Sequence, residues 1–192
     1  MTFLKNLLAR LVLASLLLCH FGGAAQAAPL YTIHIDTATL GGGQAYLGLY
    51  FLGLADAAPA TATVSGLSGA FAAPAQISGP VSGALPGALT FSNGGELVQS
   101  VSLGGVLSFS VSFTQGSGNS NAGTTFGWAL FDETHYLGAD GDLGTLALQP
   151  GLPVVVNNAS PLSSVQAVPE PATVLMLSLG LLCIAWRVRR LG

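Results

Sequence analysis

Hydrophobic and polar residues alternate along several segments of the chain. The segment 31–36 (YTIHID) places Tyr31, Ile33 and Ile35 on one face of an extended strand, and 106–113 (VLSFSVSF) has serine at each polar position between its large apolar residues. A period of two is the pattern of a strand with one buried face. Shorter segments of the same kind predict further strands at 45–52, 60–65, 88–92, 97–103, 125–131, 144–148 and 153–156.

Glycine clusters separate these segments and mark turns between them. They occur at 41–43, 94–95, 104–105 and 116–119. Short strands at this spacing, without helical periodicity, predict an all-β fold: an antiparallel β-sandwich or a jelly-roll-like ectodomain. The stretch 71–89, rich in Ala, Pro, Gly and Ser, leaves two alternatives open, a short strand around 76–81 or a long surface loop.

The first 27 residues have the layout of a secretory signal peptide, which would form a short helix. Lys5 and Arg10 supply the positive region and residues 11–19 the apolar centre. Ala25 and Ala27 give the small side chains that a signal peptidase requires at the −3 and −1 positions, so cleavage is expected after Ala27. An uncleaved membrane helix is the alternative; its apolar centre would be short for a membrane span.

A second hydrophobic segment, 172–186, contains no charged residue and precedes a basic tail at 187–192. Its fifteen residues would form a helix about 22 Å long, against a hydrocarbon core of about 30 Å. Trp186 and Arg187 can extend it into the interface. We expect a single C-terminal transmembrane helix, with the arginines on the cytoplasmic side under the positive-inside rule. A buried helix of the globular domain is the alternative.

Two prolines precede this helix, in the motif Val168, Pro169, Glu170 and Pro171, and three arginines follow it, Arg187, Arg189 and Arg190. This constellation resembles the PEP-CTERM sorting signal of exosortase substrates. The resemblance implies an exported protein of a Gram-negative bacterium that makes exopolysaccharide or biofilm matrix. It also implies that the secretion machinery exports the chain, that the inner membrane holds the precursor, and that an exosortase processes it for the cell surface.

The chain therefore divides into four predicted parts. They are a signal peptide (1–27), a β-sandwich ectodomain (28–159), a linker (160–167) and the sorting signal (168–192), with its motif at 168–171 and helix at 172–186. All the basic residues lie in the two end parts: Lys5, Arg10, Arg187, Arg189 and Arg190. The segment 28–167 has seven Asp and Glu and a formal charge of −7. Nucleic acid is thereby excluded as a partner, because it is bound through Lys and Arg.

The two cysteines, Cys19 and Cys183, also lie in the end parts. The ectodomain consequently has no disulfide, no thiol nucleophile and no cysteine-bound zinc. Its stability must come from a hydrophobic core, which a domain of this length can form, or from a bound ion.

Four acidic residues within eleven positions form a candidate calcium site: Asp132, Glu133, Asp140 and Asp142. Ca²⁺ prefers carboxylate and carbonyl oxygens. The EF-hand spacing is absent, because the segment after Asp142 lacks the later acidic ligands. A solvated hairpin turn at Asp140-Gly141 is the alternative, and we expect no obligatory cofactor.

Catalysis has little support in the sequence. His34 and His135 are the histidines that remain after signal cleavage, and either would be needed as a general base. His34 falls on the polar face of its strand, and no G-x-S-x-G nucleophile motif is present. We therefore expect no catalytic residues and no enzyme activity.

Six aromatic residues in or beside the predicted strands are candidates for stacking on sugar rings: Tyr46, Tyr50, Phe51, Trp128, Phe131 and Tyr136. Core packing is the competing interpretation. It is favoured for Trp128, which shares a strand face with Phe126 and Leu130.

The leading hypothesis is a non-enzymatic surface or extracellular-matrix protein associated with exopolysaccharide. The alternative is a carbohydrate- or calcium-binding module, and a secreted hydrolase comes last. The segment 31–148 is also similar to ectodomains of uncharacterised PEP-CTERM proteins, through 31–36, 60–65 and 144–151. This second resemblance implies a shared β-domain and no activity.

Overall fold

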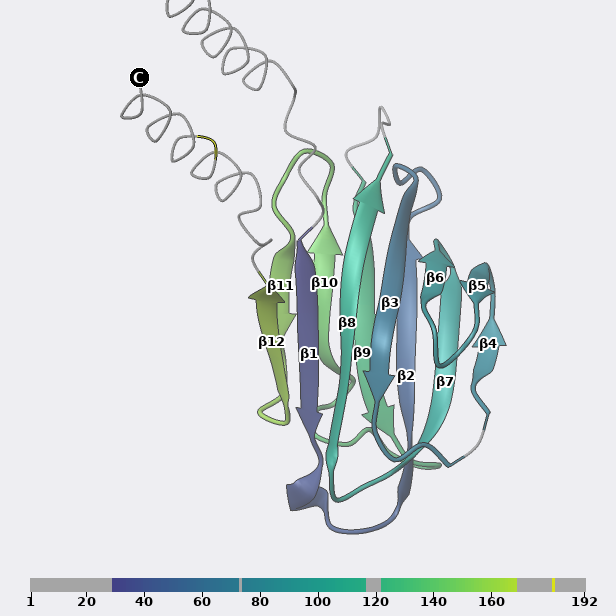
Figure 1. Ribbon diagram of the computed structural model, residues 1–192, viewed down its shortest axis with the longest axis vertical. Coiled ribbons are helices and arrows are strands. Elements are labelled where there is room, and N and C mark those ends of the chain that lie inside the picture. The colour runs from purple at the N-terminus through teal and green to yellow at the C-terminus, as the bar shows by residue number, and fades with distance from the viewer. Residues whose placement is uncertain (1–28, 73, 117–121, 169–180, 182–192) are drawn as a thin grey trace, which may run out of the picture.

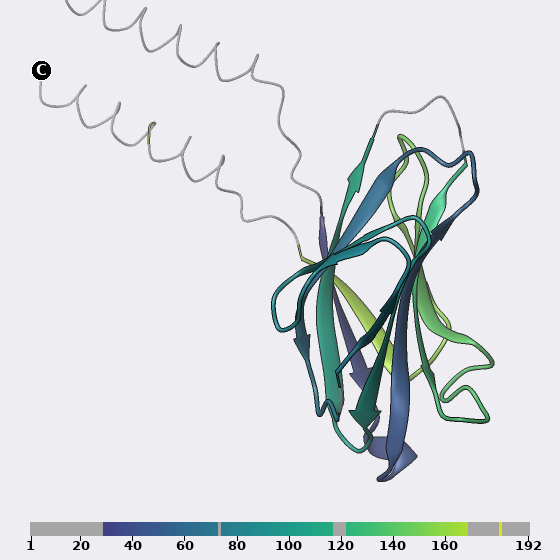
Figure 2. The same cartoon turned by 90° about the vertical axis from the view of Figure 1, so that its right-hand side faces the viewer.

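The computed structural model describes residues 29–72, 74–116, 122–168 and 181. Two six-stranded antiparallel sheets form the domain (Figure 1), and the view along their edges shows them packed face to face (Figure 2). Sheet A has the strand order β12 (Ser163–Val168), β1 (Leu30–Asp36), β8 (Val106–Gln115), β3 (Ala60–Ser68), β6 (Leu89–Ser92) and β5 (Val81–Gly83). Sheet B has the order β11 (Val155–Asn158), β10 (Asp142–Leu148), β9 (Thr124–Phe131), β2 (Gln44–Gly53), β7 (Gly95–Ser102) and β4 (Gln76–Ser78). A short 3₁₀ helix, η1 (Ala38–Leu40), follows β1.

The predicted all-β class and its two antiparallel sheets are confirmed. Most of the long strands alternate between a buried and a more exposed position, as in β8, where Leu107, Phe109 and Val111 are buried and the intervening serines are not. The inner faces of the two sheets thus supply one shared core. Burial of these side chains is the main source of stability for this cysteine-free domain.

The centre of the core is aromatic. Trp128 on β9 is fully buried, with Phe126 6.5 Å and Phe109 6.4 Å away between ring centroids. The indole lies directly over Gly144 on β10, where an added Cβ would come within 2.3 Å of the ring. The core placement that the sequence favoured for Trp128 is therefore confirmed.

The predicted linker at 160–167 is wrong for most of its length. Residues 163–168 form β12, which pairs with β1 from Ile35↔Ser163 to Leu30↔Val168. Ser160 and Ser163 are also buried, so this part of the chain completes the sandwich. The strand was not apparent in the sequence because its polar residues face solvent at a sheet edge and its stability depends on β1, far away in the chain.

The uncertain stretch 71–89 contains two short strands, β4 and β5, as well as loops. β4 pairs with β7 and β5 pairs with β6, each over three residues, so that they form one edge of each sheet. The short length of both strands limits exposed edge pairing.

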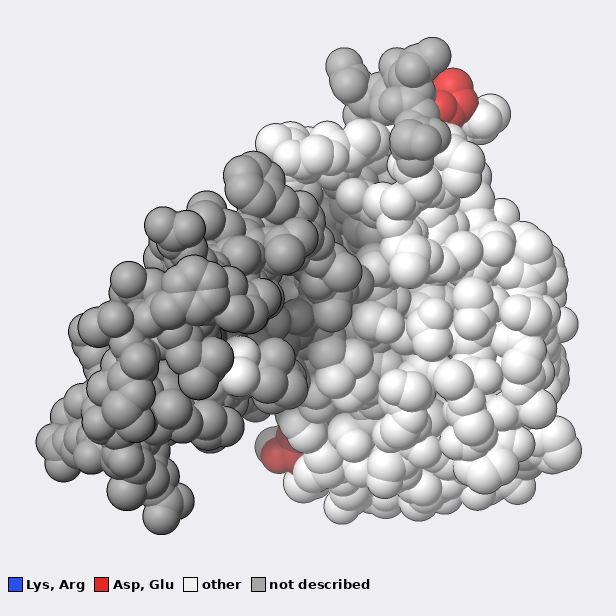
Figure 3. Space-filling view, turned by 45° about the horizontal axis from the view of Figure 1, so that its top comes forward, with Lys and Arg blue, Asp and Glu red and all other residues white. Residues whose placement is uncertain are grey.

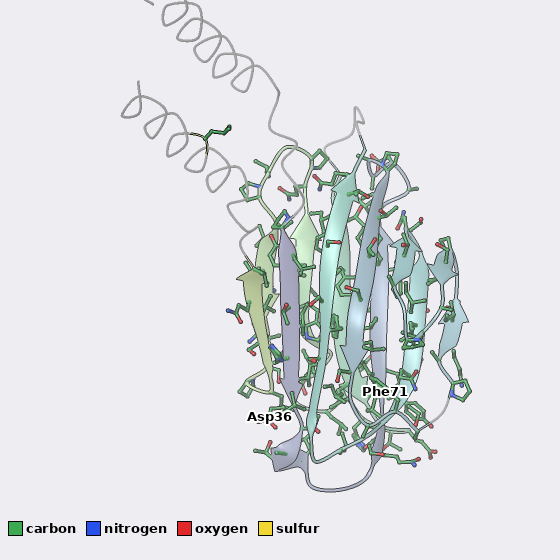
Figure 4. The ribbon with its side chains drawn as sticks, viewed as in Figure 1. Asp36 and Phe71 are labelled. Atoms are coloured by element: carbon green, nitrogen blue, oxygen red, sulfur yellow. The ribbon has the colours of Figure 1, made fainter. Side chains whose placement is uncertain are left out.

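The pairing of Leu30 with Val168 places both ends of the domain at the same end of the sandwich. Asp36, at the other end of β1, and Phe71 mark the opposite end (Figure 4). The predicted signal peptide and nearly all of the predicted C-terminal helix lie outside the described residues. Within the described part of the chain, no helix has the length and apolar character needed to span a membrane.

Candidate functional site

The four acidic residues predicted as a calcium site have separate structural roles. Asp132 directly follows β9, and its Oδ1 accepts hydrogen bonds from the backbone N–H groups of Thr134 (2.7 Å) and His135 (2.8 Å). These bonds, together with one from the Thr134 hydroxyl, hold the pKa of Asp132 below its ordinary value. Its carboxylate therefore stabilises a turn.

Asp142 begins β10, where its Oδ2 accepts a hydrogen bond from the hydroxyl of Tyr50 on β2. Asp140 and Glu133 are exposed. In the ranges 29–72, 74–116 and 122–168 and at residue 181, no three His, Cys, Asp or Glu side chains gather as metal ligands. The described carboxylates thus do not form the calcium cluster that their spacing suggested.

The two candidate histidines both lie on the surface. His34 is exposed on the outer face of sheet A, between Ser108 and Ser164 on the neighbouring strands. His135 lies in the exposed turn after β9, with its Nδ1 2.6 Å from Thr134 Oγ1 and 3.9 Å from Asp132 Oδ1. Each histidine is therefore exposed on the surface rather than held in a cleft.

The six candidate aromatic residues divide between the core and the surface. Phe51 and Trp128 are fully buried between the sheets. Tyr46, Phe131 and Tyr136 form a row outside sheet B, with ring centroids 5.7 Å and 6.1 Å apart along the row. Tyr50 lies on the same outer face of β2 as Tyr46. Four of the six residues are thus placed where a ligand can reach them.

Two glycines allow aromatic rings to lie across the strands of sheet B. A Cβ at Gly127 would come within 2.2 Å of Tyr50 Cζ, and one at Gly48 within 3.1 Å of Phe131 Cε1. Each ring therefore occupies the space where a neighbouring side chain would project. The outer surface of sheet B is consequently flat and aromatic around β2 and β9.

Tyr50 is held in this position by burial and by its hydrogen bond to Asp142. Burial is the larger cause, followed by the bond to that carboxylate, and together they raise the pKa of Tyr50 far above its ordinary value. The phenol therefore stays protonated and remains a donor at neutral pH.

Cross-strand register continues this surface into a row across sheet B. Glu96, Tyr50, Gly127, Thr145 and Asn157 are successive partners on β7, β2, β9, β10 and β11. Four inter-strand steps span about 19 Å. The row begins with the carboxylate of Glu96 and the ring of Tyr50, and its other end carries the hydroxyl of Thr145 and the amide of Asn157.

A hollow lies at the β10–β11 end of the row. Its volume is about 560 Å³, and Asp140, Asp142, Thr145 and Asn157 supply its hydrogen-bonding side chains. Asp142 connects the hollow to Tyr50, because its carboxylate lines the hollow and also accepts the hydrogen bond from the hydroxyl of Tyr50. Backbone at Gly141 and Gly144 forms part of the wall.

The charge of this surface is negative. The described residues include no Lys or Arg. Figure 3 shows a different face of the molecule, where acidic groups likewise stand among uncharged residues. Two carboxylates at the hollow would repel phosphate or an anionic sugar. The arrangement can bind hydroxyl-rich, uncharged groups.

Thr145 and Asn157 did not stand out in the sequence. Thr145 lies in the strand predicted at 144–148, Asn157 directly follows the one predicted at 153–156, and their proximity follows from the register of β10 with β11. Alternation alone could have placed Thr145 on the outer face, since Leu146 and Leu148 of the same strand face inward.

The C-terminal motif follows the sandwich without an intervening loop. Val168 is the last residue of β12 and the first of the motif predicted at 168–171. A family model described as the PEP-CTERM protein-sorting motif matches residues 167–190. The chain carries a PEP-CTERM sorting motif.

The PEP-CTERM match accounts for the motif and the segment after it, and it implies an exported protein that an exosortase processes. Comparison with curated proteins gives no match, and comparison with solved structures gives none either. The likeness of residues 31–148 to uncharacterised ectodomains therefore stays a prediction.

The PEP-CTERM motif begins inside a hydrogen-bonded strand. The match starts at Ala167, which pairs with Tyr31, and Val168 pairs with Leu30. The next residue in the sequence, Pro169, has no backbone N–H to donate. The folded domain and the PEP-CTERM motif are thus directly adjacent.

Proposed function

We propose that the protein is a non-enzymatic component of the cell surface or extracellular matrix of a Gram-negative bacterium, and that it stays associated with exopolysaccharide after an exosortase has processed it. The observation that carries the proposal is the direct junction between the β-sandwich and the PEP-CTERM motif at Val168. A folded domain with a sorting signal attached is suited to delivery as a unit.

The chemistry of the described residues supports a role without catalysis. His34 and His135 are both exposed, and the carboxylate nearest to His135 is already bonded to the turn. A general base needs a positioned partner and a site that can hold substrate beside it. The hollow on sheet B is lined instead by carboxylates, a hydroxyl and an amide.

The absence of Lys and Arg from the described residues supports a neutral polymer as the partner. Binding to nucleic acid or to an anionic membrane surface depends on basic side chains. Association with uncharged polysaccharide depends on hydroxyl, amide and carboxylate groups and on aromatic rings. Outer-face residues of sheet B provide all of these groups.

The test is fractionation of cells that express the protein, with and without synthesis of exopolysaccharide. We expect the protein in the surface-polysaccharide fraction of the first strain and in the culture medium of the second. A chain that ends at Val168 keeps β12 complete while it loses most of the PEP-CTERM motif and the hydrophobic segment. This truncated chain should be absent from the membrane fraction of both strains.

A protein that remains in the membrane fraction after truncation at Val168 would contradict the role of residues 169–192 in retention. An unchanged surface fraction in the strain without exopolysaccharide would contradict the association with polysaccharide. Intact-mass measurement of the surface-extracted protein reports both processing sites in the same samples.

A further inference from the structure

We propose that the outer face of sheet B is a binding site for a neutral saccharide, with one sugar unit held in the hollow by Asp142, Thr145 and Asn157 and the next units along the ring of Tyr50. This inference rests on the proposed function. It names the surface that would bind the polysaccharide and the chemical class of that polysaccharide.

The hollow has the size and the chemistry for a sugar. Its volume of about 560 Å³ falls within the usual range for small-molecule sites, about 300–1,000 Å³. Sugar hydroxyl groups donate and accept hydrogen bonds. Carboxylates of Asp140 and Asp142 accept, the hydroxyl of Thr145 does both, and the amide of Asn157 both donates and accepts. Adjacent hydroxyls of one ring can therefore be paired with side chains on two strands and the preceding loop.

Charge selects a neutral sugar. Two of the lining residues are acidic, and no described residue is Lys or Arg. A uronic acid, sulfate or phosphate group in the hollow would lie beside a carboxylate without a compensating cation, at a large electrostatic cost. Uncharged hydroxyl groups avoid this cost and gain charge-assisted hydrogen bonds to the same carboxylates.

Tyr50 provides a stacking surface that is already in place. The ring lies on Gly127, which has no side chain to lift it from the sheet, and its hydroxyl is bonded to Asp142. A ring fixed before binding loses little conformational entropy when a sugar stacks on it. Phe131 over Gly48, stacked on Tyr46, continues the aromatic surface beside it.

The row of cross-strand partners on sheet B predicts how a longer saccharide would lie on the sheet. From Asn157 through Thr145 and Gly127 to Tyr50 and Glu96, the row crosses five strands and about 19 Å. A saccharide chain lying across the strands would meet the polar hollow first and the aromatic surface next. We therefore expect oligosaccharides to bind more tightly than monosaccharides.

The position of the surface suits a protein sorted through its C-terminal end. Ala159 lines the hollow, and Leu162 is hydrogen-bonded to Asp36 at the end of the sandwich opposite to Val168. The hollow consequently extends from the middle of sheet B toward the end of the domain opposite to the PEP-CTERM motif. Polysaccharide can be bound there while the motif remains accessible to a sorting enzyme.

The experiment measures binding of the full chain, purified in detergent, to neutral and anionic oligosaccharides by glycan array and then by calorimetry with the best neutral hit. We expect binding to neutral glycans and at least tenfold weaker binding for Thr145→Ala and for Asn157→Ala. Tyr50→Ala removes the stacking ring and should weaken the binding of oligosaccharides more than the binding of monosaccharides. The matched control is Thr63→Ala, a half-buried threonine on the outer face of sheet A, which should bind as the parent does.

Several results would overturn the site: no neutral glycan bound by the parent, equal binding by the Thr145 and Asn157 variants, or preference for anionic glycans. A rise in melting temperature with CaCl₂ alone, abolished by Asp142→Asn and without glycan binding, would assign the hollow to a cation instead. Self-association through sheet B, reduced by Tyr136→Ala in the absence of glycan binding, would assign the surface to a second copy.

Failure of this inference is separable from failure of the proposed function. If the Thr145 and Asn157 variants still fractionate with exopolysaccharide as the parent does, the association stands and this site is wrong. If they lose glycan binding but the parent itself does not fractionate with exopolysaccharide, the site stands and the proposed cellular role is wrong.

Discussion

The indole N–H of Trp128 donates a 2.9 Å hydrogen bond to the hydroxyl of Ser163, and both residues are buried. This bond crosses from β9, near the middle of sheet B, to the first residue of β12, at the edge of sheet A. The strand that leads into the PEP-CTERM motif is therefore tied to the centre of the core as well as to β1.

Removal of this hydroxyl should destabilise the domain. In Ser163→Ala the buried indole N–H loses its acceptor, and we expect the free energy of unfolding to fall by about 1–3 kcal/mol. Urea denaturation followed by tryptophan fluorescence measures the change. Ser164→Ala, at an exposed neighbouring position of the same strand, is the control and should change stability by less than about 0.5 kcal/mol. Equal effects of the two substitutions would show that the bond contributes nothing.

Methyl groups added at two glycines under aromatic rings should have unequal effects. In Gly144→Ala the new Cβ would meet the fully buried ring of Trp128, which has no free space to move into, and we expect a loss of at least about 3 kcal/mol. In Gly127→Ala the obstacle is Tyr50, which can swing toward solvent, so the expected loss is about 1–2 kcal/mol. Thermal unfolding of both variants measures the difference.

The double variant Gly127→Ala/Tyr50→Ala tests the cause. Once the ring is absent, the added methyl group has no clash, and its cost should be less than in the parent background. If Gly127→Ala destabilises the Tyr50→Ala variant as much as it destabilises the parent, the cause lies in the backbone and not in the contact with Tyr50.

Stability should decrease at alkaline pH because of Tyr50. Its pKa is raised in the folded state, so folding favours the protonated phenol. This contribution is fully present below the unfolded pKa, about 10, and is lost as pH rises toward the folded pKa. We expect the unfolding midpoint in urea to fall steadily above about pH 10.

Tyr50→Phe removes this titration and should reduce the alkaline slope. Burial also raises the pKa of Tyr31, so part of the slope will remain in the Tyr50 variant. The same slope in the parent and in Tyr50→Phe would mean that the phenol is equally free to ionise in both states.

The boundary of the folded domain should lie at Val168 and not before Ser163. Truncation after Val168 keeps all six pairs between β1 and β12, and we expect a cooperatively folded product. Truncation after Leu162 removes β12, exposes the edge of β1 and leaves the Trp128 N–H without its acceptor. Circular dichroism and size-exclusion chromatography of the two products should show a folded monomer and an aggregating or unfolded chain, respectively. Equal stability would show that β12 is dispensable.

Much of the sandwich could be predicted because its long strands carry a period of two with one apolar face. Segments 31–36 and 106–113 form β1 and β8 with the expected residues buried. The core position of Trp128 follows from the strand face that it shares with Phe126 and Leu130. β12 was missed because its short sequence, SSVQAV, has only two large apolar residues, and its stability comes from pairing with β1. Local pattern carries no information about a partner that is more than a hundred residues away.

The candidate site could be predicted only in part. Tyr46, Tyr50, Phe131 and Tyr136 were named from their residue type, and the structure places them outside sheet B. The carboxylates were grouped by their nearness in sequence, whereas Asp132 bonds to its own turn and Asp142 bonds to Tyr50. The hollow depends on the register that brings Thr145 beside Asn157, and register is a property of the folded sheet.

The pairing of Leu30 with Val168 sets an order for the folding of this exported chain. β1 is the first strand to be synthesised, but its partner β8 begins at Val106 and its other partner β12 ends where the PEP-CTERM motif starts. Contacts between such distant segments form slowly, because the loops between them must close first. The sandwich therefore cannot be completed until all of its strands have been exported. The chain consequently remains unfolded while it passes through a secretion channel. β12 then pairs with β1 only when the chain next to the PEP-CTERM motif has been exported.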